Sequence, residues 1–149
     1  MTIVNSGHFG TVNEKSVSDF EGVIGASLPR DYVDFLLEHN GGTPENGDGS
    51  VFCFFPLRDI ECRDHRVVEI DDLKGYPLHC ARRDFVREYS DEIEGSESVL
   101  PIGTDGNGNF ICLSLEENSF GEVSFFDHET LDLDTVAGSF EEFLQNPVL

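Results

Sequence analysis

The pattern of apolar and polar positions predicts two helices near the start of the chain. The first covers residues 16–24. The second covers about 29–39, where apolar residues recur on one helical face: Leu28, Tyr32, Phe35 and Leu36. Pro29 suits the first turn of this helix, because its fixed φ and missing N–H cost little there. Asn40 and the two glycines after it supply left-handed residues that end the helix.

Strands are predicted where β-branched and aromatic residues are bounded by turn residues. The loop 41–50 is rich in Asn-Gly and Asp-Gly pairs, and a buried strand is expected after it at 51–55. Three more strands are predicted at 100–103, 110–115 and 122–127. Between them, 104–109 (TDGNGN) is a reversal and 116–121 closes a hairpin. One face of the strand at 110–115 is apolar: Ile111, Leu113 and Leu115.

Two further helices are expected. Residues 84–93 carry apolar side chains spaced by four: Phe85, Tyr89 and Ile93. The last helix follows Ser139, which can form a capping box with Glu142. Residues 58–73 are not assigned, although Val67, Val68 and Ile70 are compatible with a short strand. This order predicts a single α+β domain over 1–149, with a mostly antiparallel central sheet flanked by helices.

The charge of the chain is strongly negative. Thirty acids face nine Lys and Arg among 149 residues, for a net charge of −21. Residues 88–149 contain fifteen acids and no Lys or Arg. A field of this sign repels phosphates, so direct nucleic-acid binding is disfavoured, whereas a basic protein would be attracted. The alternative is that the acidity serves solubility only.

Nothing in the chain is typical of export or of a membrane anchor. Residues 1–10 lack a basic start and an apolar core, and the longest near-apolar run, 51–57, is too short to span a bilayer. A cytoplasmic protein is therefore expected. The four cysteines show no paired spacing. Two of them, Cys53 and Cys112, lie in apolar strand-like runs and are expected to be reduced core thiols.

The sequence contains two candidate metal sites, and neither is predicted to bind a metal. Four potential zinc ligands lie mid-chain: Cys62, His65, His79 and Cys80. Their spacing fits no common zinc motif, since adjacent His and Cys ligands are awkward for one tetrahedral ion. Four oxygen donors match positions 1, 3, 5 and 12 of an EF-hand loop: Asp105, Asn107, Asn109 and Glu116. Phe110 replaces the required glycine, so a β-turn is favoured over calcium. No cofactor is predicted.

Catalysis is not predicted either. The five histidines are scattered, and none lies in a known catalytic signature. Asp127-His128-Glu129 could polarise an imidazole, but it lies at a strand end typical of solvated turns. A small hydrolase using His128 and Asp127 is the least favoured hypothesis.

One string is more specific than its helical pattern requires. Residues 21–42 read E-x-x-I-G-x-x-L-P-x-x-Y-x-x-F-L-x-x-x-N-G-G. This resembles the opening motif of the SUKH superfamily, which includes Smi/Knr-type fungal cell-wall regulators and many bacterial toxin-immunity proteins. Residues 100–113 are similar to the central strand-turn-strand of the family, and 121–127 and 137–144 look like its late strand and terminal helix. The resemblance covers about 17–144, but 58–95 is not matched and the Trp often found in the family is absent.

The resemblance implies a non-enzymatic bacterial immunity protein. It is expected to bind a basic cognate toxin, often a nuclease in this family, and to block it by occlusion. The alternative is a general interaction or regulatory scaffold of the Smi/Knr type. The expected partner-binding residues flank two exposed loops and a strand end: Glu45, Asp48, Asp105, Asn107, Asp127 and Glu129. Reversing the charge of Asp105 and Asp127 is expected to weaken binding and to leave the fold intact.

Overall fold

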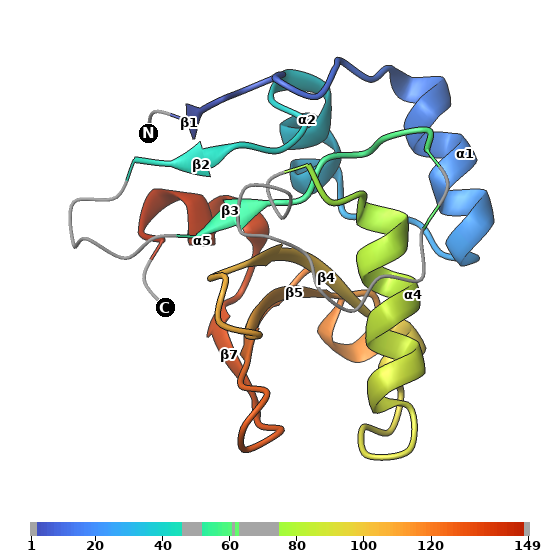
Figure 1. Cartoon of the computed structure of the whole chain (residues 1–149), viewed down its shortest axis with the longest axis vertical. Helices are drawn as coiled ribbons and strands as arrows, with labels where there is room; N and C mark the ends of the chain where they lie inside the picture. Colours follow the sequence, from blue (N-terminus) through green and yellow to red (C-terminus); the bar gives the residue numbers. More distant parts are fainter. Residues whose placement is uncertain (1–2, 46–51, 61, 63–74, 148–149) are drawn as a thin grey trace.

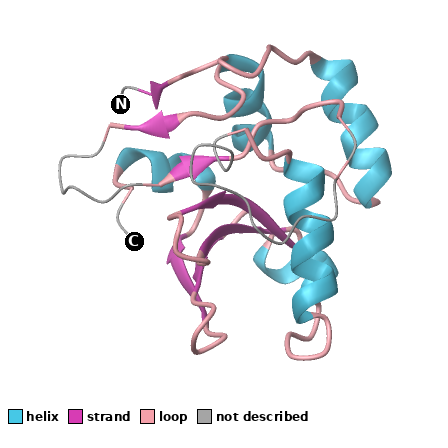
Figure 2. Ribbon diagram, in the orientation of Figure 1, coloured by secondary structure: helices cyan, strands magenta, loops and turns pink. Residues whose placement is uncertain are grey.

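The computed structural model describes residues 3–45, 52–60, 62 and 75–147. Figure 1 shows the chain coloured along its length, and Figure 2 shows the same view by secondary structure. The α-helices of the described part are α1 (Glu14–Ile24), α2 (Arg30–Glu38), α4 (Leu78–Tyr89) and α5 (Phe140–Gln145). The strands are β1 (Ile3–Val4), β2 (Thr43–Pro44), β3 (Cys53–Phe54), β4 (Val99–Thr104), β5 (Phe110–Ser114), β6 (Val123–Phe126) and β7 (Leu133–Ala137). Two 3-10 turns are η1 (Ser96–Ser98) and η2 (Glu117–Ser119).

The strands form one five-stranded antiparallel sheet and one two-stranded sheet. The larger sheet has the order β3-β4-β5-β6-β7, so neighbours along the chain are neighbours in space. β1 pairs with β2, and a single bridge between Gly42 and Phe54 links this pair to β3. The predicted α+β fold with a mostly antiparallel sheet is therefore confirmed.

The middle of the larger sheet is buried on both faces. On one face, Ile111 and Leu113 of β5 join the main core together with α2 and α5. On the other face, Cys112 and Phe126 pack against Phe85 of α4, which runs in front of the strands in Figure 1. This two-sided burial explains why β5 begins with a continuous apolar run rather than a clean alternation.

Three phenylalanines from distant parts of the chain form the centre of the main core. Phe35 of α2 lies 4.9 Å from Phe54 of β3 and 5.1 Å from Phe140 of α5, measured between ring centroids. The ring planes are inclined at 65° and 63°, the edge-to-face arrangement that aromatic pairs prefer. These contacts fix α2 and α5 beside each other.

Most predicted elements are confirmed, with bounds shifted by a few residues. α1 and α2 match 16–24 and 29–39, and Pro29 is the N-cap of α2. The predicted cap of α5 is also present, because the Ser139 hydroxyl accepts the N–H of Glu142 at 3.1 Å. The Glu142 carboxylate accepts the N–H of Gly138 instead of that of Ser139, so the predicted capping box is only half formed.

The helix predicted at 84–93 was wrong in its bounds. α4 begins at Leu78, directly after Pro77, which has the extended conformation of an N-cap residue. It ends at Tyr89, and Ile93 lies in the following turn, where its N–H donates to the Tyr89 carbonyl at 2.8 Å. Because of this turn, Ile93 packs in the same apolar cluster as Phe85 and Tyr89. The spacing by four therefore indicated residues that share a cluster and not a continuous helix.

Three strands were not predicted. β1 and β2 have only two residues each, too few for a pattern. β7 has four exposed residues out of five, so its sequence resembles a loop. The strand expected at 51–55 is represented by the shorter β3, and Val51 lies outside the described residues. The possible strand at 67–70 also lies outside them.

Asn40 joins three segments at the end of α2. Its side chain is buried, with 2% of its surface exposed. The amide nitrogen donates to the carbonyls of Gly10 at 3.1 Å and Leu57 at 3.0 Å, and the amide oxygen accepts the Leu57 N–H at 2.7 Å. The backbone of Asn40 is left-handed, with φ of 46°, as the sequence predicted. One amide therefore holds together the N-terminal segment, the end of α2 and the chain after β3.

We expect Asn40→Ala to lower the free energy of unfolding by about 2–3 kcal/mol, because it leaves buried backbone groups at Leu57 without partners. Chemical denaturation measures this loss. Asn40→Gly should show a similar loss, although glycine tolerates the left-handed backbone. Asn118→Ala, at an exposed position in η2, should change stability by less than about 0.5 kcal/mol. Wild-type stability of Asn40→Gly would contradict the role of the amide.

Candidate functional site

The predicted contact residues gather at one edge of the sheet. Every neighbouring pair of strands is antiparallel. The C-terminal ends of β4 and β6 therefore lie beside the N-terminal ends of β3, β5 and β7. β2 ends there as well, because it runs antiparallel to β3. We call the loops at this end of the strands the loop edge. It consists of Glu45, residues 104–109 and residues 127–132. It contains five of the predicted residues, Glu45, Asp105, Asn107, Asp127 and Glu129, whereas Asp48 lies outside the described residues.

The loop 104–109 is held by its own side chains. The Asp105 carboxylate accepts the N–H of Asn107 at 2.8 Å and the side-chain amide of Asn109 at 2.9 Å. The Thr104 hydroxyl donates to the Asn109 carbonyl at 2.9 Å and accepts the N–H of Gly106 at 3.1 Å. The reversal predicted from the sequence is confirmed, and its residues have the roles expected of a β-turn.

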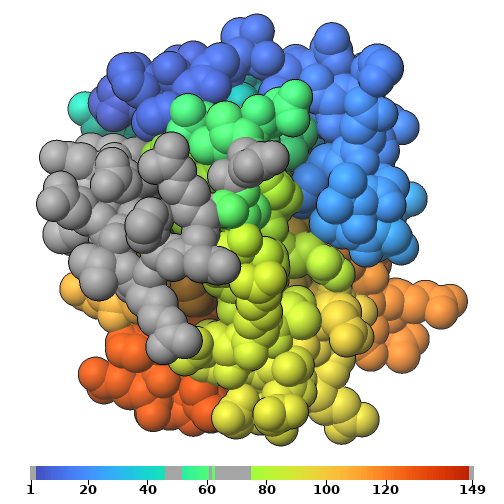
Figure 3. Space-filling model, turned by 45° about the vertical axis from the view of Figure 1, so that its right-hand side comes forward, coloured from blue at the N-terminus to red at the C-terminus, as the bar shows by residue number. Residues whose placement is uncertain are grey.

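Asn109 also fixes the second loop of the edge. Its side-chain oxygen accepts the backbone N–H of His128 at 3.1 Å and lies 2.7 Å from Nδ1 of the same residue. Gly108 faces this ring so closely that a Cβ there would lie 3.1 Å from Nδ1. Residues 104–109 and 127–132 therefore form one connected surface, seen in gold and orange-red at the lower left of Figure 3.

These contacts bear on the calcium and hydrolase hypotheses. β5 carries Glu116 to the opposite edge of the sheet, more than about 15 Å away at the usual rise per residue, so it cannot complete a calcium site with Asp105. The Nδ1 atom of His128 faces the amide of Asn109 and not a carboxylate. The Asp127 carboxylate accepts the N–H of Glu129 at 2.9 Å, as in a local turn. The geometry therefore fits turns at 104–109 and 127–129 better than a calcium site or a hydrolase site.

The carboxylates of the loop edge fall into two groups. Those of Asp105 and Asp127 are partly buried and accept hydrogen bonds that shape their loops. Those of Glu45 and Glu129 belong to exposed residues. Charge reversal at Asp105 or Asp127 would therefore disturb the loops as well as the surface charge, so Glu45 and Glu129 are the cleaner positions for testing binding.

A second acidic surface was not found from the sequence. A groove of about 260 Å³ lies between α2 and α5. Its apolar lining is Phe35, Phe140 and Leu144, and its acids are Asp31, Asp34, Glu38 and Glu141. The three acids on α2 recur at helical spacing, and this pattern in the sequence places them on one face of the helix. Glu141 on α5 is more than a hundred residues away from them in the chain, so no local sequence pattern predicts that it lies beside them.

A larger groove, of about 630 Å³, runs along α1 beside residues 57–60. It is lined by exposed apolar side chains, including Val23, which is 75% exposed, and Ile60, which is 44% exposed. Arg58 stands over the ring of Phe9 at 5.1 Å in the same groove. Apolar groups exposed in this way are typical of surfaces that contact other molecules.

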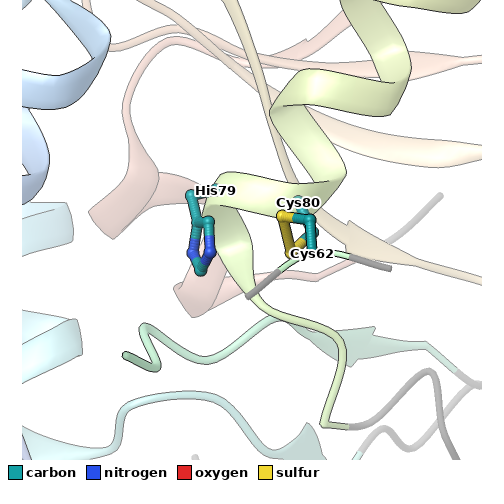
Figure 4. Close-up of side chains that lie close together, drawn as sticks. All are labelled: Cys62, His79 and Cys80. Atoms are coloured by element: carbon teal, nitrogen blue, oxygen red, sulfur yellow. A yellow bond between two sulfur atoms is a disulfide. The ribbon is translucent and has the colours of Figure 1, made fainter. Parts of the chain in front are cut away.

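The cysteines contain a pair that their spacing did not predict. Cys62 and Cys80 form a disulfide with Cα atoms 5.4 Å apart. His79 lies beside it in the first turn of α4 (Figure 4). Cys53 and Cys112 are buried and outside any disulfide, as expected, and burial raises the pKa of the Cys112 thiol well above its usual range. Reactive sulfur chemistry is therefore confined to the start of α4 in the described part of the chain.

The fold is a mixed α+β fold, and its loop edge is acidic. The chain belongs to the SMI1 / KNR4 family (SUKH-1), whose model matches residues 11–146. It is also 30% identical to the SPbeta prophage-derived uncharacterized protein YokK of Bacillus subtilis (strain 168), over 95% of this chain and 78% of that protein. The resemblance seen in 21–42 and 100–113 is thereby confirmed.

Among the described residues, none of the helices has both the length and the apolar character that crossing a bilayer requires.

We expect Asn109→Ala to lower the free energy of unfolding by about 1–2 kcal/mol, because it removes the partner of the His128 backbone N–H and loosens both loops. Amide exchange at residues 127–131 should accelerate in the same variant. Asn107→Ala is the matched control, since Asn107 is exposed and its side chain is not part of this network. Equal effects of the two substitutions would refute the coupling between the loops.

Proposed function

We propose that this chain is a bacterial immunity protein that binds a basic toxin in the cytoplasm and blocks it by occlusion, without catalysis. The observation that carries the proposal is the acidic loop edge. Residues 104–109 and 127–132 hold Asp105, Asp127, Glu129 and Asp132 and contain no Lys or Arg. Hydrogen bonds through Asn109 fix these loops relative to each other, so the charges are presented in a defined arrangement.

Electrostatics explains how such a surface would act. A net charge of −21 attracts a basic partner at long range and orients it during encounter. Toxins that cleave nucleic acid need a basic surface for their substrate, and an acidic loop edge could cover it. Exposed charges of this kind act mainly on the association rate, and salt weakens their effect.

The family and the relative support this branch of SUKH function. Members of the superfamily include immunity proteins and regulators, and neither class acts by catalysis. The relative comes from a bacterial prophage and is uncharacterized, so it favours a bacterial role without naming a partner. Together with the acidic edge, this favours immunity over a fungal type of regulation.

A general interaction scaffold is the second candidate, and the larger groove favours it. Val23 and Ile60 expose apolar surface on a face formed by α1 and residues 57–60, away from the acids of the loop edge. A scaffold would bind several partners with moderate affinity, and apolar contacts there would depend little on salt. An immunity protein would bind one basic partner tightly.

We expect affinity capture with this chain as bait to retain one basic protein at low salt and to lose part of it at high salt. Expression of the captured protein in a bacterial host should then arrest growth, and co-expression of this chain should restore it. A spread of weak partners, none of them toxic, would favour the scaffold. A toxic partner that this chain fails to neutralise would contradict the immunity function.

Glu45→Lys combined with Glu129→Lys should weaken binding of the captured protein by about tenfold or more at low salt. The effect should shrink at high salt, and titration calorimetry at two salt concentrations measures both values. Because both residues are exposed, thermal stability should stay within a few degrees of wild type.

A matched control lies at the opposite edge of the sheet. Glu97 in η1 and Glu117 in η2 are equally exposed, and their reversal to Lys makes the same change in net charge. This control should reduce affinity much less than the double change at the loop edge. Equal losses would show that overall charge matters and the loop edge does not.

A further inference from the structure

Three metal-binding side chains converge at the start of α4. Among the described residues, Cys62, His79 and Cys80 each offer a ligand atom, and these atoms all lie within 4.8 Å of one another. Figure 4 shows His79 and Cys80 on the first turn of α4, with Cys62 reaching them from a separate segment. The sequence argued against shared ligation by adjacent His and Cys residues, yet the first turn of the helix presents both of them toward Cys62.

The donor set is that of a zinc site once the disulfide is reduced. A tertiary phosphine reduces the Cys62–Cys80 disulfide to two thiols and leaves as its oxide, with water supplying the oxygen and the two protons. Two equivalents of a small thiol give the same two thiols and leave as their own disulfide. Binding of Zn²⁺ then releases two thiol protons and leaves two thiolate ligands. Two thiolates and one imidazole match the Cys₂His donor set known for zinc, in which the fourth position holds water.

The hydrogen bonding of His79 suits ligation. Its Nε2 atom lies 2.8 Å from the Ile60 carbonyl, which can only accept a hydrogen bond, so Nε2 carries the proton. A neutral ring with this proton has its lone pair on Nδ1, and ligand histidines usually donate their other N–H to a carbonyl or carboxylate in this way. The same bond keeps Ile60 beside α4 independently of the disulfide.

The surroundings favour thiolates and allow an ion to enter. Cys80 is the third residue of α4, where the helix dipole stabilises a negative charge, and the N-cap Pro77 makes no side-chain hydrogen bond there. His79 and Ile60 also line the groove of about 630 Å³ along α1, which gives solvent a path to the imidazole. Cys112, by contrast, is buried with its thiol pKa raised, so it is no competitor for metal.

We propose that Cys62, His79 and Cys80 form a Zn²⁺ site in the reduced protein. A small-molecule disulfide that takes two electrons from the two thiolates leaves as two thiols, so that the Cys62–Cys80 disulfide forms and Zn²⁺ is released. A reducing cytoplasm, in which disulfides are rare, would hold the metal-bound form. In either form the segment after β3 stays attached to α4. This inference is independent of the proposed immunity function.

Cobalt titration of the full chain tests the proposal. Protein reduced with a phosphine, stripped of metal and kept free of oxygen should bind one Co²⁺ with thiolate charge-transfer bands and the intense visible bands of a four-coordinate ion. One equivalent of Zn²⁺ should abolish these bands. The oxidised protein should show none, because a disulfide cannot supply thiolates. A reduced protein without thiolate bands, or an oxidised protein with equal binding, would overturn the proposal.

Variants locate the ion. Cys62→Ser should remove the thiolate bands or shift them strongly, and His79→Ala should weaken Co²⁺ binding by at least about tenfold. His8→Ala is the matched control, since His8 is exposed and lies outside the cluster, and it should bind as the wild type does. Circular dichroism confirms that each variant is folded. Wild-type bands and affinity in both Cys62→Ser and His79→Ala would place the metal elsewhere and refute the site.

Discussion

The buried amide of Asn40 is the interaction on which the arrangement of the N-terminal half depends. It satisfies backbone groups of Gly10 and Leu57 at the point where α2 ends and the chain turns toward the sheets. Gly42 completes this corner, because a Cβ there would lie 2.6 Å from Cγ2 of Ile3 and 2.8 Å from the Val4 carbonyl oxygen, so β1 would have to shift. The same residue accepts the N–H of Phe54 and so joins the small sheet to the large one. Changes here would therefore spread beyond a single loop.

The corner and the loop edge show how one scaffold keeps its buried core apart from an exposed, charged surface. The Phe35, Phe54 and Phe140 contacts bury the centre of the molecule, and the acids stand at strand ends and on helix surfaces. Loops on a rigid sheet can carry charge at little cost to the core. The acids of the loop edge divide further, since Asp105 and Asp127 shape the loops whereas Glu45 and Glu129 face solvent. A surface built in this way can vary in charge while the fold persists.

The start of α4 is a third region with its own chemistry. Two sulfurs and one imidazole meet there, beside an exposed apolar groove and away from the acidic loop edge. The Ile60 carbonyl and the disulfide both attach the segment after β3 to the helix. Sulfur chemistry at this place would act on the attachment of that segment, and the loop edge shares no residue with it. The proposed partner binding and the proposed metal chemistry can thus be tested separately.

The sequence by itself determined the features that depend on near neighbours. Apolar spacing located α1 and α2, Gly and Asn located the reversal at 104–109, and Ser139 located the start of α5, because each depends on contacts within a few residues. It also identified the family and five residues of the loop edge. Tertiary structure alone decided the pairing of Cys62 with Cys80, the contact of Asn109 with His128, the closing of α2 against α5 and the existence of β7. The first three are contacts between residues too far apart in the chain to leave a local pattern. The fourth depends on which face of an element becomes buried. Only the packing of the whole chain determines such contacts and such burial.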